Sequence, residues 1–100
     1  MTIEIAANQL DSLGNPTRLQ IFRLPVRAGK TGLSVGRLQT KMDMDMVAST
    51  LTHHLKRLIE AVLVTQERAA TTLVFRAVCL KMWALISYLK DECCADESSA

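Results

Sequence analysis

The chain has 100 residues, of which 49% are hydrophobic, 22% charged and only 4% aromatic. This length suits one small domain, and the composition excludes a disordered or fibrous protein. No uncharged stretch approaches the roughly 20 residues that a membrane span needs. The acidic rather than basic N-terminus predicts no secretory signal. The net charge of +2 permits a nucleic-acid partner without requiring one.

Three cysteines, Cys79, Cys93 and Cys94, are an odd number without the spacing of a disulfide framework. We therefore expect a reduced chain in the cytoplasm, because disulfides persist mainly in oxidising compartments. A domain of this size buries only part of its surface. The high apolar fraction thus favours a small oligomer, in which some apolar surface lies between subunits.

The first part of the chain predicts two helices. Apolar residues at helical spacing predict the first over residues 3–13. Asn15 is placed to cap the second, with Pro16 at the first helical position, where its missing N–H costs nothing. Pro25 falls inside this second helix and should kink it or shorten its last turn.

Two further helices follow a turn over residues 27–32. Ser34 should cap the first of them, a short helix that faces inward through Val35, Leu38 and Met42. Asp45 can cap the fourth helix of the chain, which should run to about Ala61.

The hydrophobic period then changes. Residues 63–68 and 72–77 predict two strands joined by a polar turn, and residues 80–93 return to helical spacing. The predicted fold is mainly α with a β-hairpin, in the order α-α-α-α-β-β-α, which is that of a winged helix-turn-helix. We expect one DNA-binding and dimerisation domain over residues 1–94 and a flexible acidic tail over residues 95–100.

The fourth predicted helix has an apolar face and a polar face. The polar face carries Ser49, Thr50, Thr52, His53, Lys56 and Arg57. Short hydroxyl side chains can approach base edges, and cations suit phosphates. A helix N-terminus also favours phosphate through its free N–H groups. The solvated face of an ordinary amphipathic helix explains the same pattern equally well.

The predicted hairpin is basic. Arg68 flanks its turn, and Arg76 lies on the return strand. A basic hairpin beside a recognition helix can reach a neighbouring groove or the phosphate backbone. Simple surface charge explains Arg76 at least as well.

Three segments, in order, resemble the ArsR/SmtB family of bacterial winged-helix repressors. Residues 13–24 resemble the second helix of that family, and residues 33–38 resemble the start of the first helix of its helix-turn-helix. Residues 49–64 resemble its recognition helix and the entry to the wing. The resemblance covers about residues 10–78. It implies a homodimer, paired through its first and last helices, that binds double-stranded operator DNA and is released by an inducer. The DNA-facing residues that it implies are Ser49, Thr50, Thr52, His53 and Lys56.

The chain departs from this family in three places. The interval from Leu38 to Ser49 is longer than usual, which enlarges the turn before the recognition helix. Val62 stands where a helix-ending glycine is common, and a β-branched residue disfavours a positive φ. Pro25 replaces what is typically a leucine. Each change is expected to lower stability or shift the recognition helix.

Both metal sites that are usual among relatives are missing. The third helix has no cysteine and the last has no histidine, while His53 and His54 lie on the predicted recognition helix. What remains is the pair Cys93 and Cys94 at the end of the last helix. Vicinal cysteines form a strained disulfide, but they can offer two soft thiolates to one thiophilic ion, as in some arsenic-responsive relatives.

The leading hypothesis is a dimeric transcriptional repressor that requires no cofactor and is released from its operator by arsenite or antimonite. These metalloids bind three sulfurs, so the third ligand would be Cys79, a cysteine of the other subunit or an external thiol. A buried structural role is the other interpretation of Cys79. The alternatives are a repressor that senses oxidation through a disulfide and a winged helix that binds protein. An enzyme is not expected, because no catalytic set or phosphate loop is visible.

Overall fold

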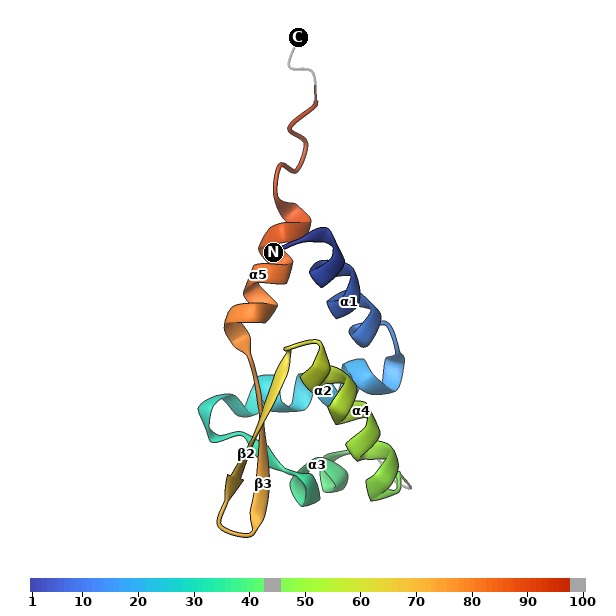
Figure 1. Ribbon diagram of the computed structural model, residues 1–100, viewed down its shortest axis with the longest axis vertical. Coiled ribbons are helices and arrows are strands. Elements are labelled where there is room, and N and C mark those ends of the chain that lie inside the picture. The colour runs from blue at the N-terminus through green and yellow to red at the C-terminus, as the bar shows by residue number, and fades with distance from the viewer. Residues whose placement is uncertain (43–45, 98–100) are drawn as a thin grey trace.

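The computed structural model describes residues 1–42 and 46–97. Figure 1 shows a lower body of helices with a projecting hairpin, and two further helices above it. In chain order the elements are α1 (Ile3–Leu13), α2 (Pro16–Ala28), the 3₁₀-helix η1 (Gly29–Thr31), β1 (Leu33–Ser34), α3 (Val35–Lys41), α4 (Ala48–Glu60), β2 (Val64–Ala69), β3 (Thr72–Ala77) and α5 (Cys79–Lys90). Apart from β1, this is the predicted order.

The sheet is antiparallel with the strand order β1-β3-β2. In the hairpin, which we call the wing, Val64 pairs with Ala77 and Ala69 pairs with Thr72. The short strand β1 joins the other edge of β3, where Leu33 pairs with Phe75. A strand of two residues is too short to show an alternating pattern, so β1 could not be predicted from the sequence.

Gly32 lets β1 lie against β3. Its φ is +68°, and a Cβ at this position would lie 2.7 Å from Cγ1 of Val74 and 2.8 Å from the carbonyl oxygen of Phe75. Only glycine combines this backbone conformation with so close an approach.

Two of the predicted helix caps are confirmed. The Asn15 side chain accepts a hydrogen bond of 3.0 Å from the backbone N–H of Arg18, and Ser34 Oγ accepts one of 3.2 Å from that of Arg37. Asp45 lies outside the described residues. Helix α4 begins at Ala48, and Val47 occupies its N-cap position without a side-chain hydrogen bond.

Two predicted helix ends are wrong. Helix α2 continues past Pro25 to Ala28, so Pro25 does not shorten its last turn, whereas the alternative expectation of a kink stays a prediction. Pro25 is buried, and its packing offsets the hydrogen bond that its nitrogen cannot donate. Helix α5 ends at Lys90 rather than near Cys93. Its last predicted residues are acidic and exposed, so no packing extends the helix.

The core lies between α2, α3, α4 and the sheet. Its fully buried side chains include Ile21, Leu38, Leu51, Leu55, Leu58 and Leu63. Helix α5 adds only Leu85 to the buried residues. Helix α1 turns Ala6, Gln9 and Ser12 inward. The sequence thus predicts α1 correctly as a helix, but most of its large apolar residues point outward.

Helix α4 ends in a Schellman motif. The N–H of Val62 donates to the carbonyl of Ile59 at 2.9 Å, and that of Leu63 donates to the carbonyl of Leu58 at 3.0 Å. This motif places Val62 at a φ of 61°, a conformation that is unusual for a β-branched residue. The predicted conflict at Val62 is therefore present in the fold.

Replacing Val62 with glycine should stabilise the protein. Relief of the backbone strain is worth about 1–3 kcal/mol, while the extra freedom of glycine in the unfolded chain costs about 0.5–1 kcal/mol. We expect Val62→Gly to raise the free energy of unfolding by roughly 1 kcal/mol in urea denaturation at fixed protein concentration. Ala70→Gly, at a φ of 60° without β-branching, is the matched control and should gain less. A loss of stability in Val62→Gly would contradict this account.

Candidate nucleic-acid interface

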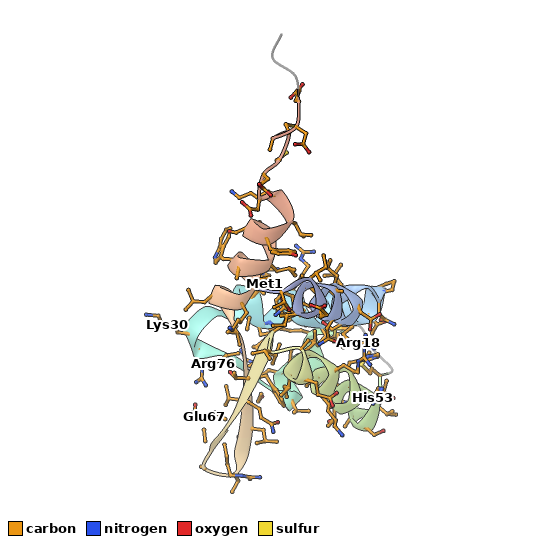
Figure 2. The ribbon with its side chains drawn as sticks, turned by 45° about the horizontal axis from the view of Figure 1, so that its top comes forward. Met1, Arg18, Lys30, His53, Glu67 and Arg76 are labelled. Carbon is orange, nitrogen blue, oxygen red and sulfur yellow. The ribbon has the colours of Figure 1, made fainter. Side chains whose placement is uncertain are left out.

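The outer face of α4 is polar and exposed. Leu51, Leu55 and Leu58 are buried on its inner face, which fixes the direction of every other side chain on the helix. Five of the six predicted site residues on this helix are exposed: Ser49, Thr50, Thr52, His53 and Lys56. His53 is labelled on α4 in Figure 2. The structure thus brings these five residues together on one helix.

Helix α3 packs against α4, and the two form a helix-turn-helix. The amide Nε2 of Gln39, on α3, donates a 3.0 Å hydrogen bond to the carbonyl of Met46, just before α4. This bond links α3 to the segment that leads into α4. The predicted enlargement of the turn falls on residues 43–45, which lie outside the described part of the chain. Gln39 therefore helps to position the start of α4.

The N-terminus of α4 is suited to an anion. The first N–H groups of a helix have no partner within it, and among the described residues no side chain caps this end, where Val47 is the N-cap. The hydroxyl groups of Ser49 and Thr50 lie in the same turn. Together with the helix dipole, these donors favour a phosphate group.

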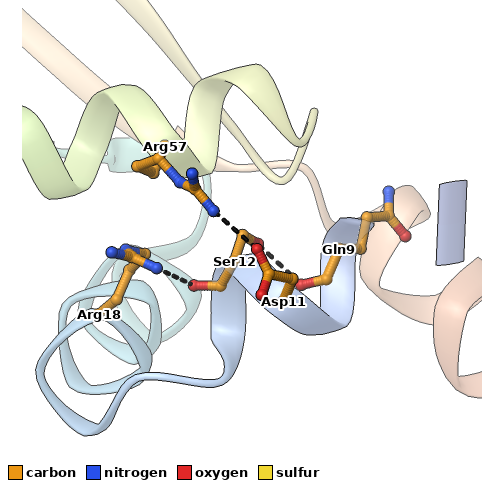
Figure 3. A network of polar contacts seen from close by, with 5 residues as sticks. All are labelled: Gln9, Asp11, Ser12, Arg18 and Arg57. Carbon is orange, nitrogen blue, oxygen red and sulfur yellow. Dashed lines mark hydrogen bonds and ion pairs between the residues drawn. The ribbon is translucent and has the colours of Figure 1, made fainter. Parts of the chain in front are cut away.

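Arg57 is held away from this surface. Its Nη2 lies 2.9 Å from Oδ2 of Asp11 in α1, as Figure 3 shows. Arg18 nearby donates to the carbonyl of Ser12 at 3.2 Å, and the Ser12 hydroxyl donates to the carbonyl of Gln9 at 2.7 Å. Arg57 thus joins α4 to α1, a role that no local spacing could reveal, since Asp11 lies 46 residues away.

His54 is a half-buried neighbour of this surface. Burial lowers its pKa below the ordinary value, and the positive charge of Arg18 and the neighbouring His53 lower it further. Its Nδ1 is buried and has no hydrogen-bond partner in the part of the chain that the structure describes. His54 is therefore neutral at pH 7 and packs against the body of the protein.

The two wing arginines differ. Arg68 is exposed on β2 near the tip of the wing. Arg76 lies between Lys30 and Glu67 in Figure 2. It contacts Oε1 of Glu67 at 2.7 Å and donates through Nε to the carbonyl of Lys30 at 2.8 Å. Arg76 thus braces the base of the wing, and Arg68 is the arginine free to reach outward.

The cysteines lie at opposite ends of α5. Cys93 and Cys94 follow the helix, are exposed, and have their Sγ atoms 3.6 Å apart. Cys79 begins the helix and is exposed, not buried as the structural interpretation expects. The twelve residues of α5 extend about 18 Å, so Cys79 of the same chain does not reach the pair. No group of three metal-ligating residues occurs in residues 1–42 and 46–97.

The packed α3–α4 pair followed by the β2–β3 wing defines a winged helix-turn-helix domain. A family model described as a helix-turn-helix domain matches residues 13–67. None of the curated proteins compared with the chain matches it. Among the described residues, no helix has the length and apolar character to cross a bilayer.

Several solved structures share this fold. NolR from Sinorhizobium fredii is 30% identical over 86% of this chain and 84% of its own, with a TM-score of 0.63. An ArsR-like transcriptional regulator from Rhodococcus sp. RHA1 is 20% identical. The match covers 87% of this chain and 77% of the regulator, with a TM-score of 0.73. The homodimeric winged helix-turn-helix domain of a possible ArsR-family regulator from Mycobacterium bovis is 23% identical. The match covers 98% of this chain and 89% of that domain, with a TM-score of 0.69. The chain belongs to the ArsR family of winged-helix transcriptional regulators.

Two neighbouring cations of α4 provide a test of the interface. Lys56 is exposed on the outer face, whereas Arg57 is paired with Asp11. We expect Lys56→Gln to weaken binding to mixed-sequence duplex DNA and to reduce the slope of log affinity against log salt by about 1. Arg57→Gln removes the same charge and should change the slope less. Fluorescence anisotropy over a range of salt concentrations measures both, and equal effects would contradict the assignment.

Proposed function

We propose that the protein is a homodimeric transcriptional repressor that binds operator DNA through the outer face of α4, with the wing beside it. The observation that carries this proposal is the exposed set of hydroxyl, imidazole and ammonium groups on the outer face of α4, beginning in its first turn. Hydroxyl groups and the backbone N–H groups at the helix N-terminus can donate hydrogen bonds to base edges and phosphates. Lys56 and Arg68 would neutralise phosphate charges.

The distribution of apolar residues supports the dimer. Most large hydrophobic residues that are exposed among those described lie on or beside α1 and α5: Met1, Ile3, Ile5, Leu10, Leu80, Trp83, Ile86 and Leu89. Soluble monomers rarely expose so much apolar surface in one region, and α1 meanwhile buries the polar Gln9 and Ser12. A second copy of the chain would cover these residues. The relative from Mycobacterium bovis is itself described as homodimeric.

A charge placed on this apolar surface should separate the subunits. Ile86 is 41% exposed on α5, and Leu19 is 43% exposed on α2, outside that surface. We expect Ile86→Glu to convert a dimer into a monomer in sedimentation velocity, because the carboxylate would be buried without a partner. Leu19→Glu, the matched control, should remain dimeric. DNA affinity should fall with Ile86→Glu alone, since only a dimer engages two half-sites. A dimeric Ile86→Glu variant would contradict the proposed interface.

The proposed inducer is trivalent arsenic or antimony, and the proposed ligands are Cys93 and Cys94. Both thiols are exposed and adjacent, with 3.6 Å between their Sγ atoms. Each arsenic–sulfur bond would form as one hydroxyl group leaves arsenite and combines with the thiol proton to give one water, without any change of oxidation state. The third sulfur would come from the other subunit or an external thiol, since α5 separates Cys79 from the pair.

The pair is well placed to act on the dimer. It directly follows α5, whose exposed apolar residues we assign to the subunit contact. Metalloid binding there would change how the two α5 helices end and hence how the two α4 helices are spaced. A coupling of about 1–3 kcal/mol between inducer and DNA is enough for release.

Release of DNA by arsenite should require the pair. In a mobility-shift assay under reducing conditions, we expect arsenite to release the unmodified protein and the Cys79→Ser variant from DNA. The double variant Cys93→Ser/Cys94→Ser should stay bound to DNA. Release of the double variant would overturn the pair as sensor. Release by peroxide alone, with a new disulfide on a non-reducing gel, would favour the redox alternative. Absence of any salt-sensitive DNA binding would favour a protein-binding winged helix.

A further inference from the structure

A cavity of about 610 Å³ is lined by residues from the end of α2, η1, β1 and α3. Its lining residues are Leu24, Arg27, Ala28, Thr31, Gly32, Leu33, Ser34, Arg37 and Lys41. This volume falls within the range of ordinary small-molecule sites. Among the lining residues, Gly32 and Ser34 have the structural roles described above, and the proposed DNA and cysteine sites use none of them.

The charged residues that line this cavity are all positive. Arg27 comes from α2, while Arg37 and Lys41 come from α3, and none of the lining residues in the described ranges 1–42 and 46–97 is acidic. The ion pairs found among the described residues involve Arg57 and Arg76, not these three cations. Cations gathered around one hollow repel one another, and an anion seated between them would relieve that repulsion.

The rest of the lining is apolar or carries hydroxyl groups. Leu24, Ala28 and Leu33 supply an apolar wall, and Thr31 and Ser34 supply hydroxyl groups. A hydrated inorganic anion or a DNA phosphate would gain nothing from the apolar wall. A ligand that has both an anionic group and an apolar body would use both parts.

We propose that this cavity binds a small organic anion, in which a carboxylate or similar group contacts Arg27 and Arg37 and an apolar body packs against Leu24, Ala28 and Leu33. Arg27 lies on α2 and Arg37 lies on α3, so a ligand that contacts both would bridge the two helices. Because α3 is the first helix of the helix-turn-helix, the bound ligand would touch the element that positions α4. This inference does not depend on DNA binding or on the cysteine pair.

Three soluble probes test this proposal. Hexanoate has the charge and the apolar body, hexanamide has the same body without the charge, and inorganic phosphate has the charge alone. We expect saturable shifts of the backbone amide resonances of residues 31–37 in ¹H–¹⁵N NMR spectra when hexanoate is added at millimolar concentrations. Hexanoate should bind about tenfold more tightly than either of the other probes.

Paired charge variants provide the control. The double variant Arg27→Gln/Arg37→Gln should weaken hexanoate binding by about tenfold, and its spectrum shows directly whether it remains folded. Arg23→Gln/Lys90→Gln removes two exposed cations outside the cavity and should bind hexanoate as the unmodified protein does. Equal affinity for hexanamide, or shifts confined to α1 and α5, would overturn the proposal. Phosphate binding as tight as that of hexanoate would also overturn it, and would indicate a DNA-phosphate contact instead.

Discussion

Burial of the apolar stripe of α4 is the interaction on which the rest of the structure depends. Leu51, Leu55 and Leu58 are each at most 1% exposed, and they pack with residues of α2, α3 and the sheet in one cluster. Each fully buried side chain of this kind contributes about 1.5–3 kcal/mol. Because the stripe can face only inward, the rotation of α4 about its axis is fixed, and Thr52, His53 and Lys56 must face solvent.

The polar contacts at the edge of α4 refine this position. Gln39 holds Met46, two residues before the helix, and Asp11 pairs with Arg57 in its last turn. The ion pair is partly exposed, so its contribution to stability is small. Its effect is rather on function, because it takes one cation away from the surface offered to DNA. Charge counted along the sequence therefore overstates the basic character of this face.

Much of the fold could be predicted from local sequence. The Asn15 and Ser34 caps, the wing and the conflict at Val62 all follow from neighbouring residues, and the structure has each of them. Contacts between distant residues could not be predicted in this way. Strand β1 exists only because β3 is there to pair with it, and Arg57 meets Asp11 through the packing of α1 on α4.

The same limit explains the two ends of the chain. Helical periodicity predicts α1 and α5 but does not say which side is buried, and α1 places Gln9 and Ser12 inward. It also predicts α5 as far as Cys93, whereas the helix ends at Lys90. The DNA-facing role of α4 and the inducer role of Cys93 and Cys94 remain predictions, as does the flexibility of the tail.

Hydrogen–deuterium exchange with and without duplex DNA tests the central claim most directly. If the outer face of α4 contacts DNA, binding should slow exchange in residues 48–56 and near the tip of the wing, while the exchange of α2 changes little. Protection confined to α1 and α5, or no protection at saturating DNA, would contradict the assignment of α4 as the DNA-binding helix.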